Sequence, residues 1–178
     1  MKGKGLKNGR RDAKLTWLVA SAWMGLAMSA LPAWGQDVIQ ISGADVTTCS
    51  GLFVDDGDIG DPAGGPYTNA NYAITICPDN PGDAIAAEFI SFQLQTNANP
   101  NNNDVLFIYD GNSTAAPLIG AGTGNNFQDV TATASLNNPT GCLTFEFYCI
   151  NGATAGAIGW AAEVSCVTPC TKIGRAHV

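Results

Sequence analysis

The stretch from Gln36 to Thr171 has no lysine, arginine or histidine, although it carries fourteen of the fifteen carboxylates of this 178-residue chain. All eight cations lie outside it, six before residue 15 and two after residue 171, and the single histidine is His177. With a side-chain charge of about −14, this stretch repels nucleic acid and anionic membrane surfaces, because both bind through Lys and Arg. We expect its partners to be cations or basic proteins.

The same absence limits catalysis. General acid–base and nucleophilic mechanisms most often use His or Lys, and phosphoryl transfer uses a cationic clamp. A glycosidase-like pair of carboxylates is compatible with the composition. We therefore expect no enzymatic activity and assign no catalytic residue, and the alternative is an enzyme that works with two carboxylates converging in a cleft.

The first 35 residues have the pattern of a signal peptide. A basic segment ends at Lys14, an uncharged stretch follows over residues 15–31, and residues 33–35 are typical of a cleavage site. We expect a signal-peptide helix that is cleaved after Gly35, a secreted or cell-surface product, and no membrane insertion after cleavage. A retained membrane anchor is the alternative, but the apolar run is slightly short for a span.

The last seven residues, from Lys172 to Val178, resemble the translation of a sequencing adapter. On this interpretation the chain is a fragment whose gene continues beyond it, and the alternative is a natural basic tail. In both cases the segment is set apart from the fold, and His177 is not assigned as a ligand or a base.

Residues 36–171 have the pattern of one all-β domain. Short runs of β-branched and aromatic residues alternate with clusters of Gly, Pro, Asn and Asp, and no amphipathic helical period is present. The length is sufficient for a hydrophobic core. The predicted strands are 38–41, 72–76, 85–94, 105–109, 142–148 and 160–164, with weaker candidates at 52–53 and 118–119.

The apolar faces of these strands predict how they are buried. Within 85–94 the apolar face slips by one residue, as it does at a β-bulge. Residues 105–109 are apolar on both faces, which predicts a central strand. Residues 142–148 and 160–164 each have one apolar face, and we expect them to pair as a hairpin. Two stacked antiparallel sheets are the simplest architecture that buries all these faces.

Eight short sequence elements follow one another between Cys49 and Cys166. They are Tyr67-x-Asn69, Cys77-Pro78, Pro81-Gly82, Phe89-x-x-Phe92-x-Leu94, Asp104-x-Leu106-x-Ile108-Tyr109-Asp110-Gly111, Pro117-Leu118-Ile119-Gly120, Gly141-Cys142-Leu143-x-Phe145-x-Phe147 and Gly159-Trp160-x-Ala162. In this order they resemble a CUB domain, and they are most similar to the CUB-like modules of large secreted proteins of Bacteroidota. The resemblance implies a CUB-type jelly-roll β-sandwich.

The resemblance also implies an extracellular binding or adhesion module without catalytic activity, which recognises protein or glycan ligands beside other domains of a larger protein. The chain would then consist of a signal peptide (1–35), a lead-in (36–48), a CUB-like domain (49–166) and a linker stub with the tail (167–178). The alternative is a carbohydrate-binding accessory domain of a secreted hydrolase or protease. In that case Tyr67, Tyr72 and Tyr148 are the candidates for stacking on a sugar ring.

Many CUB domains hold a calcium ion whose carboxylate ligands also bind a basic side chain of the partner. The resemblance places Gln95, Asp104 and Asn151 at the ligand positions, with Tyr67 and Asp104 as ligand-binding residues. Only Asp104 carries a charge here, and calcium affinity follows the charge of the ligands. Calcium therefore stays open as the one candidate cofactor.

A second candidate metal site is the acidic loop Asp55, Asp56, Asp58 and Asp61, where glycines permit a tight wrap. Its spacing is not that of an EF-hand. A solvated acidic turn is the alternative, and we favour it. For Asp110, which precedes a glycine, we likewise expect a role in the turn and no ligand.

The chain has six cysteines, and in an exported protein these indicate disulfides. The family resemblance implies a bond between Cys49 and Cys77. The expected hairpin brings Cys142 and Cys166 to the same end, which favours a second bond. Cys149 and Cys170 would lie at opposite ends of that hairpin, so we predict no bond between them and leave their partners open.

Overall fold

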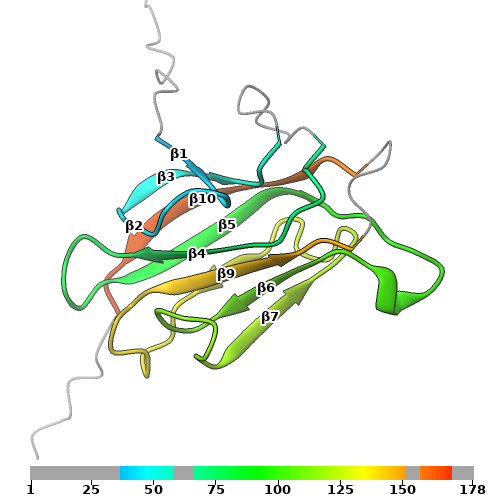
Figure 1. Cartoon of the computed structure of the whole chain (residues 1–178). Helices are drawn as coiled ribbons and strands as arrows, with labels where there is room; N and C mark the ends of the chain where they lie inside the picture. The colour runs from blue at the N-terminus through cyan, green and yellow to red at the C-terminus, as the bar shows by residue number, and fades with distance from the viewer. Residues whose placement is uncertain (1–36, 58–65, 151–156, 170–178) are drawn as a thin grey trace, which may run out of the picture. The chain divides into compact units, whose positions relative to one another are not determined.

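The computed structural model describes residues 37–57, 66–150 and 157–169, and these form two five-stranded sheets (Figure 1). The first sheet has the order β1 (Val38–Gln40), β3 (Ser50–Val54), β10 (Gly159–Val167), β5 (Ala84–Gln93) and β8 (Thr131–Thr133). The second has the order β2 (Val46–Thr47), β4 (Tyr72–Cys77), β9 (Leu143–Tyr148), β6 (Val105–Tyr109) and β7 (Leu118–Gly122).

The connections are loops apart from one 3₁₀ turn, η1 (Pro100–Asn102). Within the three described ranges, no helix is long and apolar enough to cross a membrane. The predicted signal-peptide helix lies outside the described residues. The expected lead-in, residues 36–48, contributes two edge strands, because β1 pairs with β3 and β2 pairs with β4, both in parallel.

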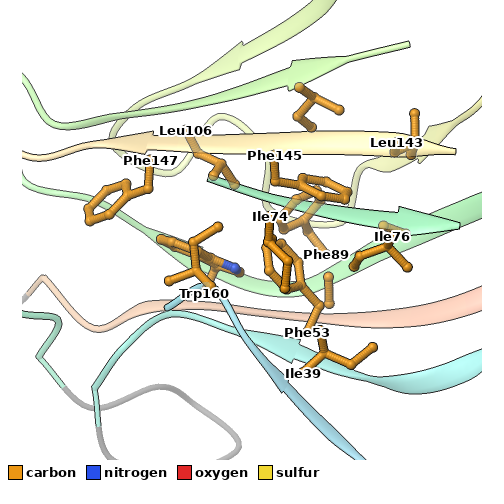
Figure 2. Packing of buried hydrophobic residues seen from close by; sticks show 14 of the residues in the cluster. Ile39, Phe53, Ile74, Ile76, Phe89, Leu106, Leu143, Phe145, Phe147 and Trp160 are labelled. Carbon is orange, nitrogen blue, oxygen red and sulfur yellow. The ribbon is translucent and has the colours of Figure 1, made fainter. Parts of the chain in front are cut away.

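Aromatic side chains from both sheets fill the space between them (Figure 2). The ring centroids of Phe53 (β3) and Phe145 (β9) are 4.6 Å apart, and those of Phe147 (β9) and Trp160 (β10) are 5.0 Å apart. All four side chains are fully buried. Tilted and edge-on ring pairs of this kind add about 0.5–1.5 kcal/mol beyond the burial of their area. The core therefore joins the two sheets.

The strand predictions from the sequence are largely confirmed. All eight expected strands are present, and the predicted bulge is real, because Ala161 pairs with Ser91 whereas Ala162 pairs with Phe89. Ile90 is the extra residue, which explains why the buried face changes there. Strand β6 lies between β9 and β7 as expected. The sequence did not predict β2 and β8, which are edge strands of two and three residues.

The predicted hairpin between 142–148 and 160–164 is wrong. Strand β9 pairs with β4 and β6, whereas β10 pairs with β3 and β5, so the two strands lie in different sheets (Figure 1). Strands that follow one another in the chain commonly change sheets in jelly-roll folds. One-sided apolar alternation shows that each strand faces the core, but it does not identify the neighbour.

The predicted disulfide pairing is also wrong, although the same four cysteines are used. Cys49 bonds to Cys166 with a Cα–Cα distance of 4.9 Å, and Cys77 bonds to Cys142 with a Cα–Cα distance of 4.2 Å. The register explains this result, because Ser50 lies opposite Ser165 and Ile76 lies opposite Leu143. One residue further along each antiparallel pair, Cys49 lies opposite Cys166, and Cys77 lies opposite Cys142. Each disulfide thus joins two neighbouring strands of one sheet.

Cys149 lies just beyond β9 and is buried, and its backbone N–H donates to Asn71 Oδ1 at 2.8 Å. Cys170 lies outside the described residues. The expectation that these two cysteines do not bond to each other therefore stays a prediction.

Candidate functional site

A buried hydrogen-bond network is centred on Asp104, the residue before β6. Its side chain is fully buried. Oδ2 accepts a hydrogen bond from the Tyr67 hydroxyl at 2.8 Å, and Oδ1 accepts one from the Ile150 N–H at 2.7 Å. The Tyr67 oxygen in turn accepts from the Gln95 N–H at 2.8 Å. The carboxylate and the phenol therefore hold three loops together at this end of the sandwich.

Tyr67 is 3% exposed, and its ring meets Phe147 edge-on with centroids 5.0 Å apart. Burial raises the pKa of Tyr67 above its ordinary value, and the nearby Asp104 raises it further. The phenol therefore remains a hydrogen-bond donor at physiological pH. Because the ring is covered, Tyr67 is not available for stacking on a sugar. Tyr72 is half-buried, and Tyr148 is 48% exposed.

The network brings together Gln95 and Asp104, two of the three residues expected to hold calcium, and Asn151 lies outside the described residues. The Gln95 side chain donates through Nε2 to the Thr96 carbonyl at 2.8 Å. Both oxygens of Asp104 already accept hydrogen bonds, and calcium takes six to eight oxygen ligands. In the ranges 37–57, 66–150 and 157–169, no three His, Cys, Asp or Glu side chains are grouped to hold a metal. These residues do not by themselves fit a calcium ion.

Two residues of the acidic loop, Asp55 and Asp56, lie in the described part of the chain, and their carboxylates accept hydrogen bonds from backbone N–H groups. Asp55 accepts hydrogen bonds from Gly57 N–H at 2.7 Å and from Trp160 N–H at 2.9 Å. Asp56 accepts from the N–H and the hydroxyl of Thr68. Each of the two carboxylates thus joins the end of β3 to a distant segment. Asp58 and Asp61 lie outside the described residues, so the metal-binding interpretation of the whole loop stays a prediction.

Asp55 is almost completely buried at 1% exposure, and this burial raises its pKa from 3.8 to about 6. Gly159 leaves the space that the carboxylate occupies. A Cβ atom at Gly159 would lie 1.7 Å from Asp55 Oδ2, and the φ angle of +79° is also one that favours glycine. The start of β10 is therefore shaped around this carboxylate.

Asp110 has a structural role, but its carboxylate hydrogen-bonds to another loop and not within its own turn, where we expected its role. Its Oδ1 accepts from the Ser135 N–H at 3.0 Å and from Asn138 Nδ2 at 2.8 Å. Partial burial opposes ionisation, but the hydrogen bonds from Ser135 and Asn138 outweigh it, so the pKa of Asp110 is lowered. The aspartate thus fixes the loop after β6 against the loop that follows β8.

A surface pocket of about 380 Å³ lies beside β1 and β2, the edge strands of the two sheets. Asp37 is the one carboxylate among its lining residues. Carboxylate catalysis of the glycosidase type needs two such groups facing one substrate. This pocket therefore does not supply the pair that the enzymatic alternative requires.

No family model matches the sequence, and no curated protein matches it. Solved structures do match. The CUB1-EGF-CUB2 region of human MASP-1/3 has a TM-score of 0.51 at 15% identity over 74% of this chain. The MASP-1 CUB2 domain bound to Ca²⁺ has a TM-score of 0.50 at 16% identity, over 70% of this chain and 98% of that one. The chain has a CUB-like fold.

A third match is the full extracellular region of zebrafish Gpr126/Adgrg6, with a TM-score of 0.53, 14% identity and 73% of this chain covered. This chain spans 15% of that protein's length and 44% of the human MASP-1/3 fragment. At these identities, the likeness shows the CUB-like fold alone.

Glu146 lies on the solvent side of β9 and is not among the site residues predicted from the sequence. Its Oε2 accepts a hydrogen bond from the Tyr109 hydroxyl of β6 at 2.7 Å. The signal was present in the alternation of β9, where the apolar Phe145 and Phe147 flank Glu146. The alternation does not show which strand lies beside β9. It therefore could not identify Tyr109 of β6 as the partner of Glu146.

Proposed function

We propose that the chain is a non-catalytic extracellular binding or adhesion module of a larger secreted or surface protein, and that it recognises basic side chains of a protein partner. The observation that carries the proposal is a CUB-like sandwich without one Lys, Arg or His between residues 36 and 171. A surface of one sign attracts ligands of the other and speeds their encounter. The two disulfides support an oxidising, extracellular compartment.

In this proposal, Tyr67 and Asp104 act by fixing the loops at their end of the sandwich, where loops carry most binding functions in such folds. Calcium is not required for binding.

A second candidate is a carbohydrate-binding accessory domain of a secreted hydrolase or protease. The observation in its favour is Tyr148, a residue that is 48% exposed on the outer face of the second sheet. Exposed aromatic rings of this kind can stack on a sugar.

The test measures binding of the purified, exported chain to two arrays. One array carries short peptides of equal length with arginine or lysine, with aspartate or glutamate, or with neutral residues, and the other carries glycans. We expect binding to the basic peptides that weakens with added salt, because exposed charges are screened. Glycan binding without basic-peptide binding would favour the second candidate, and binding to neither array would contradict both.

A further inference from the structure

The outer face of the second sheet carries aromatic side chains around one carboxylate. In β6 and β9, Leu106, Ile108, Phe145 and Phe147 point into the core and are buried. Because side chains alternate along a strand, the residues between them point outward. They include Phe107, Tyr109, Glu146 and Tyr148, which we call the aromatic face.

The strand register places these four side chains together. Phe107 lies directly opposite Glu146, and Tyr148 follows Glu146 two residues along the same strand. Tyr109 reaches diagonally across to Glu146 and donates its hydroxyl at 2.7 Å. On the other side of Glu146, the paired residue of β4 is Ala73, which is small and exposed. The carboxylate is therefore flanked by rings on one side and accessible from the other.

Glu146 is half-buried, and its second oxygen, Oε1, has no hydrogen-bond partner in the described part of the chain. That part also has no cationic side chain that could neutralise it. Donation to Glu146 raises the pKa of Tyr109, so this phenol stays a donor to the carboxylate. A half-buried carboxylate beside two half-buried rings, Phe107 and Tyr109, and one exposed ring, Tyr148, is an environment that favours an external cation.

Arginine fits this environment better than a sugar does. A guanidinium group is planar, stacks on aromatic faces and pairs with a carboxylate in fixed geometry. A sugar needs hydrogen-bond donors as well as acceptors, but the Tyr109 hydroxyl already donates to Glu146. The Thr75 and Thr144 hydroxyls on this side are buried and bonded to each other at 3.0 Å.

We infer that the aromatic face binds an arginine side chain of a partner protein, with Glu146 pairing the guanidinium and with Phe107 and Tyr148 contacting its plane. The inference rests on the proposed function and assigns it a place. Leu118 of β7, which is 53% exposed and lies opposite Tyr109, extends the apolar surface beside the site. The partner segment is therefore expected to present apolar side chains next to its arginine.

The test titrates a blocked Gly-Arg-Gly peptide into the ¹⁵N-labelled exported chain and follows the amide shifts. We expect the largest shifts at residues 105–109 and 144–148. The same peptide with citrulline in place of arginine keeps the shape but loses the charge, and we expect no shifts with it. Glu146→Gln keeps an acceptor for Tyr109 and removes the charge, so binding should weaken by about tenfold, as for the loss of a charged hydrogen bond.

Glu163→Gln is the matched control, because it removes the same charge from the outer face of the other sheet. Glu163 lies opposite Leu52 of β3 and Glu88 of β5, and neither of these neighbours is aromatic. Binding should change less than twofold. Tyr148→Leu tests the ring at an exposed position and should weaken binding severalfold. An unchanged affinity in Glu146→Gln, or shifts that lie mainly elsewhere, would overturn the inference while leaving the proposed function intact. If no basic peptide binds, both the inference and the proposed function are contradicted.

Discussion

Asp55 connects a local sequence feature with the stability of the whole sandwich. Its carboxylate is buried between the end of β3 and the start of β10, where Gly159 makes room for it. Two backbone N–H groups stabilise the charged form, but the loss of water around the carboxylate outweighs them. The folded protein therefore binds a proton at Asp55 more tightly than the unfolded chain does.

This proton affinity predicts an unusual dependence of stability on pH. The pKa of Asp55 is about 6 in the folded protein against an ordinary 3.8, so its contribution is complete below about pH 4 and is lost as the pH rises through 6. We expect the free energy of unfolding to fall by about 2–3 kcal/mol over this window because of Asp55. Urea unfolding at a series of pH values measures the fall.

Asp55→Asn removes the titrating group and should flatten the curve between pH 4 and 6. Asp110 is the internal reference, because its lowered pKa has the opposite effect, and its contribution is lost only as the pH falls below its ordinary range. An Asp55→Asn variant with the same slope as the wild type would show that another group causes the fall.

At the level of single strands, most of the fold could be predicted from the sequence. The bulge at Ile90 was visible because the apolar face changes phase within one strand. The pairing of β9 and β10 was not predictable in this way, because alternation is a local signal whereas pairing joins residues far apart. The short edge strands β2 and β8 have too few residues to show a period at all.

The candidate site was predictable to a similar extent. The resemblance to CUB domains singled out Tyr67, Gln95 and Asp104, and the structure joins all three in one network. Their contacts were not predictable, because the hydroxyl of Tyr67 meets Asp104 only after the loops are placed. Glu146 and Tyr109 meet only through the register of β6 and β9, which the sequence does not display.

The strand register predicts the disulfide map. Proteolysis of the unreduced chain should give crosslinked peptides containing Cys49 with Cys166 and Cys77 with Cys142. These bonds close loops with sequence separations of 117 and 65 residues, so each should contribute about 4–5 kcal/mol on the chain-entropy model. Replacing both cysteines of either pair by alanine should lower the free energy of unfolding by a similar amount.

Because closure entropy grows only with the logarithm of loop length, the two double variants should differ by no more than about 0.5 kcal/mol. A crosslinked peptide joining Cys49 to Cys77 would contradict the register on which this prediction depends.

At the scale of the whole molecule, the carboxylates of residues 36–171, which carry all the charge of this stretch, divide into two roles. Carboxylates such as Asp55, Asp104 and Asp110 hold backbone N–H groups and are committed to the fold. Glu146 differs, because its Oε1 has no hydrogen-bond partner in the described part of the chain and aromatic rings flank it on one side. In the function we propose, the acidic surface attracts basic proteins, and the aromatic face holds an arginine side chain of the partner.

The predicted calcium site of this chain has one acidic residue, Asp104, whereas the family resemblance implies a site with three. Because Asp104 is the single charged residue of this predicted site, we expect the melting temperature of the protein to be the same in millimolar calcium as in magnesium at equal ionic strength. Gln95→Glu restores one of the missing charges beside Asp104 and should create a calcium-specific rise in melting temperature. A rise already present in the wild type, and lost in Asp104→Asn, would show that neutral oxygens suffice and that calcium belongs to the binding site.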